Sequence, residues 1–218
     1  MESLTIANTH SGLQVEGFPN AIKVIALNTP RATRLAQLAL HGDDLREALR
    51  CVGAINEAPN ETLRNAAWLS AIVLYMKSFQ GAARRFSLDA KNIYGGNPVA
   101  VQVFEYFKAL RNKHFVHDEN DYAQAHPGAI INGPEEPFKV AKIVVSTSVG
   151  QTLEEANWQN LRRLIEDALK YVDRASDELA DELTKELETE TREALLSRPL
   201  LEFSAPKVEA IGTRRSAP

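Results

Sequence analysis

The chain has 218 residues, 44% of them hydrophobic, which is enough for a full core, and no apolar run approaches the ~18 residues of a membrane span. Its net charge of −4 excludes a protein that coats nucleic acid through bulk charge. The single cysteine, Cys51, excludes an internal disulfide, and no cationic segment precedes an apolar run at the N-terminus, so we expect a cytoplasmic protein without a secretory signal or membrane contact.

The first elements are an arm and a helix. Residues 1–28 form an N-terminal arm that holds one or two short strands or packs loosely, and the sequence leaves both alternatives open. Thr29 followed by Pro30 is typical of a helix start, a cap before a first-turn proline. Leucines at helical spacing extend this helix, with a kink expected near Gly42, until it stops before Pro59.

Two further helices follow. One starts near Asn60 and runs to about Gly81 with a wide apolar face. In the next, Asn97 is a natural cap and Pro98 occupies the first helical position, where a missing N–H costs nothing. Its apolar stripe consists of Ala100, Val103, Phe104, Phe107 and Leu110.

The rest of the chain predicts an insert, a long helix and a tail. Residues 119–137 are rich in Pro, Gly and Asn and predict a loop, and 138–149 predict a strand or small hairpin. Thr152 and Glu155 form a capping box before a helix that reaches about Glu193 and exceeds ~50 Å.

The predicted fold class is therefore mainly α, a bundle of four to five helices with a short β insert and a long C-terminal helix. The helical domain spans 29–193, with its insert at 119–151, and residues 194–218 form a loosely docked or disordered tail.

The apolar stripe of the third helix turns polar at its end. A regular continuation places Arg111, His114 and Asp118 on the stripe, and buried groups of this kind are costly unless paired. This end of the helix then leaves the core and faces a cleft or another subunit. The alternative is a solvated last turn, in which Lys, Arg and His suit the helix dipole.

Several enzyme classes lack their motifs here. The sequence has no G-x-S-x-G, P-loop, H-E-x-x-H or paired C-x-x-C pattern. His114, His117 and Asp118, joined by His126, could begin a metal site, but we regard this as a minority hypothesis and predict no metal and no cofactor.

One spacing points to a specific chemistry. In "LRNKHFVHD", Arg111 and Asn112 are followed by four residues and then His117, which resembles the R-x4-6-H motif of the HEPN superfamily. The segment "WLSAIVLYMKSFQGAARRFSL" at 68–88 also resembles the helix before this motif in abortive-infection-like members, and the resemblance spans about residues 30–185. It implies a helical bundle and a metal-independent endoribonuclease of toxin–antitoxin or phage-defence systems. An antitoxin or a nucleotidyltransferase is then an expected partner.

The resemblance also implies roles. His117 would act as general base or acid, Arg111 would clamp the phosphate and Asn112 would orient it by a hydrogen bond. The stretch from Lys77 to His117 carries a net charge of +5, and its cations would attract RNA. These RNA-binding candidates are Lys113, Arg84 and Arg85. His114 and Asp118 would contact the catalytic residues without touching the substrate, His114 chiefly by packing.

One copy of the motif is insufficient on a regular helix. Arg111 and His117 would lie about 120° apart around the axis and ~9 Å apart along it, too far to surround one phosphate. A homodimer would bring two arginines and two imidazoles into one cleft. The competing hypothesis is a non-catalytic HEPN-like module that binds a nucleotide or protein, in which Arg111 and His117 only hold the helix end together.

Overall fold

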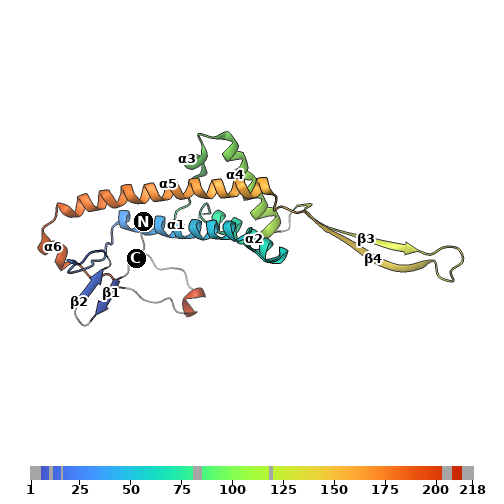
Figure 1. Cartoon of the computed structure of the whole chain (residues 1–218), viewed down its shortest axis with the longest axis horizontal. Coiled ribbons are helices and arrows are strands. Elements are labelled where there is room, and N and C mark those ends of the chain that lie inside the picture. The colour runs from blue at the N-terminus through green and yellow to red at the C-terminus, as the bar shows by residue number, and fades with distance from the viewer. Residues whose placement is uncertain are drawn as a thin grey trace. The chain divides into compact units, whose positions relative to one another are not determined.

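A computed structural model describes residues 6–9, 12–15, 17–80, 85–117, 120–202 and 208–212. The chain divides into two compact units, and Figure 1 labels helices and strands of both. Unit 1 comprises Met1–Arg46, Gln80–Leu88 and Ala168–Pro218, and unit 2 comprises Glu47–Phe79 and Asp89–Asp167. None of the helices in the described ranges is long and apolar enough to cross a bilayer.

The predicted fold class is confirmed, because the chain is mainly helical with a two-stranded antiparallel insert and a long helix near its C-terminus. The helices are α1 (Pro30–Ala54), α2 (Glu61–Lys77), α3 (Ala90–Tyr94), α4 (Pro98–Leu110), the π-helical turn η1 (Arg111–Val116), α5 (Glu155–Glu188), α6 (Arg192–Ser197) and the 3-10 turn η2 (Val208–Gly212). The strands are β1 (Ile6–Thr9), β2 (Gly12–Val15), β3 (Ala123–Ile131) and β4 (Val140–Val149). They form two hairpins, β1–β2 and β3–β4.

The predicted Asn97 cap and the predicted helix start near Asn60 are both confirmed. The Asn60 side chain accepts a hydrogen bond from the backbone N–H of Leu63 at the start of α2. The Asn97 side chain accepts from Val99 and Ala100 at the start of α4. Each cap satisfies backbone donors that the first helical turn leaves without partners, so the sequence fixes where these helices begin.

The predicted loop over 119–137 is wrong for nine of its 19 residues. Residues Ala123–Ile131 form β3, which pairs with β4 over its full length. The backbone N–H of Gly150 donates to the Tyr122 carbonyl, so Pro127, five positions along, belongs to a pair whose N–H and C=O groups point outward. A proline is tolerated there because it removes no bond within the hairpin.

The start and end of α5 also differ from the prediction. The helix begins at Glu155, and Thr152 does not cap it: the buried Thr152 hydroxyl accepts a 3.0 Å hydrogen bond from the Trp68 indole. The helix ends at Glu188 instead of Glu193, and α6 (Arg192–Ser197) extends from the predicted helix end into the predicted tail.

Segments from the N-terminal and C-terminal parts of the chain pair within unit 1. Ala26 and Leu201 donate backbone hydrogen bonds to the carbonyls of Pro199 and Val24, and the Lys23 ammonium donates to Leu196 and Arg198 carbonyls. The start of the predicted tail is therefore docked on the N-terminal arm. Its remaining residues, 203–207 and 213–218, lie outside the described ranges.

Aromatic side chains fill the core of unit 2. The rings of Trp68, Tyr75, Tyr94, Phe104 and Phe107 are buried and pack mostly edge to face. The hydroxyls of Tyr75 and Tyr94 form a hydrogen bond of 2.8 Å with each other, and the Tyr94 hydroxyl also donates to the Leu164 carbonyl at 2.8 Å. Burial raises the pKa of both phenols, so this polar pair stays neutral inside the core.

The core of unit 1 contains a buried histidine. His41 is 0% exposed; its Nε2 lies 2.9 Å from the Phe86 carbonyl, and its Nδ1 lies 2.6 Å from Arg85 Nη2. Arg85 also pairs with Asp44 at 2.6 Å. A neutral imidazole with its proton on Nε2 satisfies both ring contacts. Burial lowers the pKa of His41 from 6.5 to about 4, and the Arg85 charge acts in the same direction.

The low pKa of His41 predicts a loss of stability in acid. Between about pH 6.5 and 4 the unfolded chain binds a proton at this residue and the folded chain does not, so the free energy of unfolding falls as pH falls through this window. The contribution is on the order of 3 kcal/mol. We expect chemical denaturation of His41→Gln to show a shallower decline than wild type over this range. Equal declines in the two proteins would contradict the assignment.

Candidate functional site

The apolar stripe of α4 ends at Leu110, and the chain then widens into the π-helical turn η1. Leu110 and Phe107 are buried, whereas none of the six residues of η1 is. A π-helical turn bonds residue i to i+5, so it moves the following side chains off the line of the preceding helix. The angle of about 120° expected for Arg111 and His117 on a regular helix therefore does not hold here. Such turns are rare and occur often at functional sites.

Arg111 and Asn112 lie together at the start of η1. Arg111 Nη1 donates to the Asn112 side-chain oxygen at 2.9 Å, and both residues are half-buried. Within the described ranges Arg111 makes no ion pair. The guanidinium is thus held in one orientation while its other N–H groups have no carboxylate partner in the described part of the chain. A guanidinium in that state suits an oxyanion such as phosphate.

The other predicted site residues in or just after η1 are Lys113, His114 and His117, and they differ in how exposed they are. His117 follows the last residue of η1 and is exposed, and Lys113 is exposed as well. His114 is half-buried, with its ring 5.0 Å from Phe115 and 5.4 Å from Tyr122. Its Nδ1 is buried without a hydrogen-bond partner among the described residues. His117 is therefore the imidazole that a substrate can reach directly.

Three predicted residues, Arg84, Arg85 and Asp118, are not described as part of this group. Arg84 and Asp118 lie outside the described residues. Arg85 belongs to unit 1, where its side chain is 13% exposed and bonded to Asp44 and His41. Its predicted role as an RNA contact is not supported, because a buried guanidinium with these two partners is part of the core of that unit.

A pocket of about 370 Å³ lies beside η1, and sequence reasoning missed it. Glu61, Arg64 and Asn65 contribute polar groups from α2, and no motif in the sequence marks these residues. Its volume is in the range that small ligands occupy, and its wall mixes rings with amide and cationic groups. The remaining lining residues are Ala66, Trp68, Leu69, His114, Phe115, Val149, Gly150, Gln151, Thr152 and Leu153.

Among the described residues no group of three or more His, Cys, Asp or Glu side chains could hold a metal ion. The predicted alternative of His114, His117 and Asp118 includes a residue outside that range. No protein-family model, curated protein or solved structure matches this chain.

Proposed function

We propose that the chain is a metal-independent endoribonuclease of the HEPN type, with a site to which two copies contribute. The observation that supports this most is the arrangement on η1: Arg111 is held by Asn112, and His117 is exposed just beyond the same turn. The residue types and their order are those of the R-x4-6-H pattern. A toxin or phage-defence effector of this kind would act on cytoplasmic RNA under the control of an antitoxin or nucleotidyltransferase partner.

The proposed reaction uses the substrate's own 2′-hydroxyl. One His117 removes the 2′-hydroxyl proton as the oxygen attacks phosphorus, and His117 of the second copy protonates the 5′-oxygen as the P–O5′ bond breaks. The Arg111 groups stabilise the negative charge of the pentacoordinate phosphorus. The products are a 2′,3′-cyclic phosphate and a 5′-hydroxyl. The first His117 ends protonated and the second deprotonated, and both return to their starting states by exchanging protons with water.

The pocket beside η1 favours a second candidate, a module that binds a nucleotide without cleaving RNA. Its rings and its Arg64, Asn65 and Gln151 side chains suit a base and a phosphate. If the protein is such a module, nucleotide titrations would show binding that His117→Ala leaves unchanged, and no RNA would be cleaved.

Metal dependence tests the proposed reaction. Because the mechanism needs only side chains and the 2′-hydroxyl, we expect cleavage of a mixed RNA to persist in excess chelator and to leave 2′,3′-cyclic or 3′-phosphate ends. The same RNA with 2′-deoxy substitutions should resist cleavage. Strict dependence on a divalent ion, or 5′-phosphate ends, would instead favour metal-assisted hydrolysis and contradict the proposal.

A further inference from the structure

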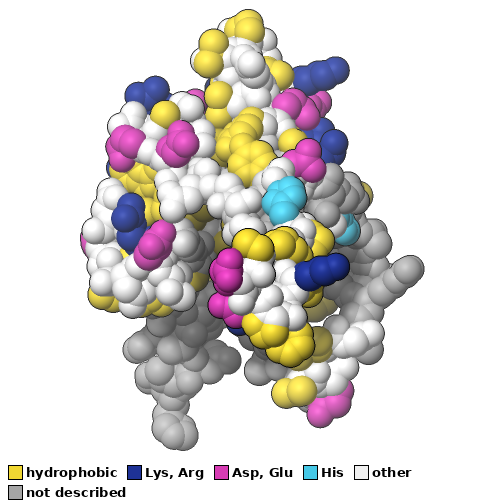
Figure 2. Space-filling model, turned by 90° about the vertical axis from the view of Figure 1, so that its right-hand side faces the viewer, with side chains coloured by type: hydrophobic (Ala, Val, Ile, Leu, Met, Phe, Trp, Pro, Cys, Tyr) yellow, Lys and Arg dark blue, Asp and Glu magenta, His cyan; other side chains and the backbone are white. Residues whose placement is uncertain are grey.

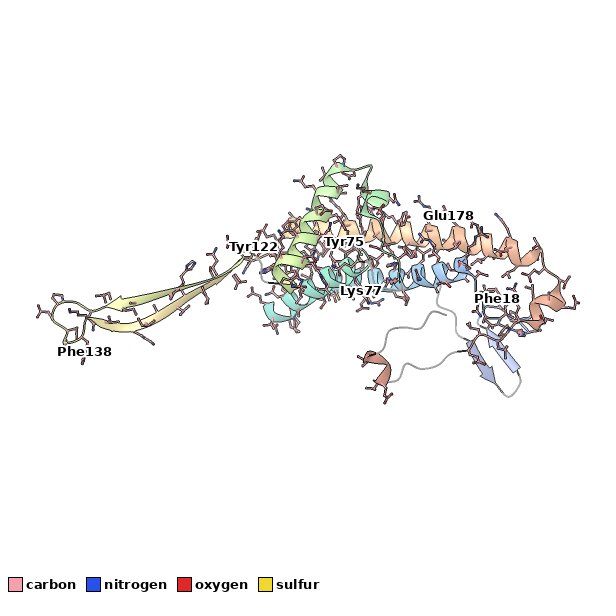
Figure 3. The ribbon with its side chains drawn as sticks, turned by 180° about the vertical axis from the view of Figure 1, so that it is seen from behind. Phe18, Tyr75, Lys77, Tyr122, Phe138 and Glu178 are labelled. Carbon is pink, nitrogen blue, oxygen red and sulfur yellow. The ribbon has the colours of Figure 1, made fainter. Side chains whose placement is uncertain are left out.

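The hairpin β3–β4 is exposed over its whole length. Every residue of both strands is solvent-exposed, and the hairpin extends away from α2 and α4 of its own unit (Figure 1). Figure 3 labels Tyr122 at its base and Phe138 near its tip. Figure 2, which looks onto the end of the molecule that carries the hairpin, shows exposed hydrophobic side chains among scattered charges. A lone two-stranded hairpin is marginally stable in water, so a partner on this hairpin would stabilise it.

The strand register assigns the hairpin side chains to two faces. Side chains alternate between faces along each strand, and directly opposed residues share a face. The hydrogen bond from His126 to Gln124 and the approach of Gly128 to Val144 agree with this assignment. The polar face carries Gln124, His126, Gly128, Ile130, Lys142, Val144, Ser146 and Ser148, and the apolar face carries Ala123, Ala125, Pro127, Ala129, Ile143, Val145, Thr147 and Val149.

The apolar face is uncharged and divided by size. All four of its β3 residues are alanine or proline, whereas β4 supplies the larger Ile143, Val145, Thr147 and Val149. Ile143 and Val149 are 65% and 67% exposed. One edge of the face is thus a shallow row and the other is a raised row.

We propose that the apolar faces of two copies of this chain pack against each other about a twofold axis that runs along the hairpin. This rotation places β3 of each copy over β4 of the other, so each shallow row receives a raised row, as in a well-packed core. A twofold axis across the hairpin would set β4 over β4 and β3 over β3, so the two raised rows would collide beside a gap between the two shallow rows. Because the face carries no charge, neither copy meets a like charge.

The strand edges favour this face-to-face arrangement over edge-to-edge pairing, in which a strand of another copy would add to the hairpin. At Pro127 the outward edge of β3 lacks an N–H donor, so strand addition on that edge is interrupted. The outward edge of β4 is intact and could pair antiparallel with β4 of another copy. That competing arrangement would place the two hairpin tips at opposite ends of the sheet, which makes the two arrangements distinguishable.

The proposed axis has a consequence for the candidate site. His117 precedes β3 by six residues, and an axis along the hairpin keeps the bases of both hairpins, and therefore both η1 turns, at the same end of the assembly. A composite site would then contain both copies of Arg111 and His117. This consequence depends on the proposed function, whereas the association of the hairpins does not.

Substitutions on neighbouring residues of opposite faces test the association. Val145→Glu buries two charges in the proposed interface, and we expect light scattering at tens of micromolar to shift from dimer to monomer. Val144→Glu, the matched control on the polar face, should remain dimeric. Both sites are exposed, so both variants should fold, as circular dichroism would verify. A monomeric wild-type protein, or equal behaviour of the two variants, would overturn the inference.

Spin labels at the hairpin tip test the axis. In a Cys51→Ser background, a label on Glu135→Cys should report a short distance between copies, under about 20 Å, if the tips are adjacent. Antiparallel pairing through β4 would give about 30 Å or more, the length of nine residues, and would overturn the proposed axis. Neither measurement involves RNA. A dimer of the proposed geometry that cleaves no RNA refutes only the ribonuclease proposal, whereas an active monomer refutes the hairpin interface and the two-copy site but not RNA cleavage itself.

Discussion

Replacing His117 by alanine removes both the general base and the general acid of the proposed two-copy site, so RNA cleavage is expected to fall by at least about 10²–10⁴-fold, the usual contribution of one such group. The imidazole is exposed at the end of η1, so its loss removes few packing contacts and should leave melting temperature and dimer content nearly unchanged. The measurement is the initial rate of cleavage of a fluorescent RNA by protein whose folding has been verified. A variant that retains full activity would show that His117 is not the catalytic group.

His126 supplies a matched control. It is also an exposed histidine, and it lies on the polar face of the hairpin with a hydrogen bond to Gln124. His126→Ala should therefore cleave RNA at the wild-type rate. Equal losses in His117→Ala and His126→Ala would point to a general effect on RNA binding or folding, and the interaction-module hypothesis would then replace catalysis.

Two substitutions of Arg111 distinguish a phosphate contact through the planar guanidinium from an effect of positive charge alone. Arg111→Ala should lose cleavage as His117→Ala does, because it removes the phosphate contact. Arg111→Lys keeps the charge but loses the planar fork that bonds Asn112 at one prong and can hold phosphate with the others, so it should restore little of the rate. Full recovery in Arg111→Lys would contradict the clamp and indicate a role for charge alone.

The elements that the sequence predicted well have strong local signals. Asn60 and Asn97 each stand before a helix with a side chain that can accept from the first turn, and both caps are present in the structure. The stripe from Val103 to Leu110 repeats at helical spacing, and its larger members Phe104, Phe107 and Leu110 are buried. Here local preference and tertiary packing favour the same structure.

The missed elements have signals that depend on distant partners. Pro127 and Gly128 read as turn residues, yet they lie inside β3 because β4, more than ten residues away, provides the pairing and leaves the proline N–H position outward. Thr152 fits a cap pattern, but its hydroxyl is taken by Trp68, which is 84 residues distant in the sequence. Such partners cannot be identified from spacing alone.

The candidate site was predictable in composition and only partly in geometry. The order of Arg111, Asn112 and His117 could be read from the sequence, and the structure joins the first two by a hydrogen bond. The π-helical turn was not predicted, because a single wide turn changes no residue preference that the sequence displays. The pairing of Arg85 with Asp44 and His41 also escaped prediction, since it joins residues more than 40 positions apart.

Phe107→Ala is expected to destabilise the protein by about 3–5 kcal/mol, the usual cost of removing a buried ring. Phe107 is 0% exposed and packs edge-on against Trp68 at 5.8 Å and Tyr106 at 5.2 Å, so alanine leaves a cavity between α2 and α4. For a chain of this size the melting temperature should fall by about 6–20 °C. Phe138→Ala is the matched control, because Phe138 is 74% exposed near the hairpin tip and its loss should change stability by less than about 0.5 kcal/mol.

The Phe107→Ala variant is also a control for the activity of His117→Ala. Phe107 lies one helical turn before Arg111, so its cavity tests whether the site is sensitive to any loss of packing beneath it. Below its melting transition, Phe107→Ala should cleave RNA at close to the wild-type rate per folded molecule, since no reacting group is removed. If it instead loses about as much activity as His117→Ala while still folded, then the η1 geometry and not the imidazole controls the rate, and the general acid–base role of His117 is contradicted.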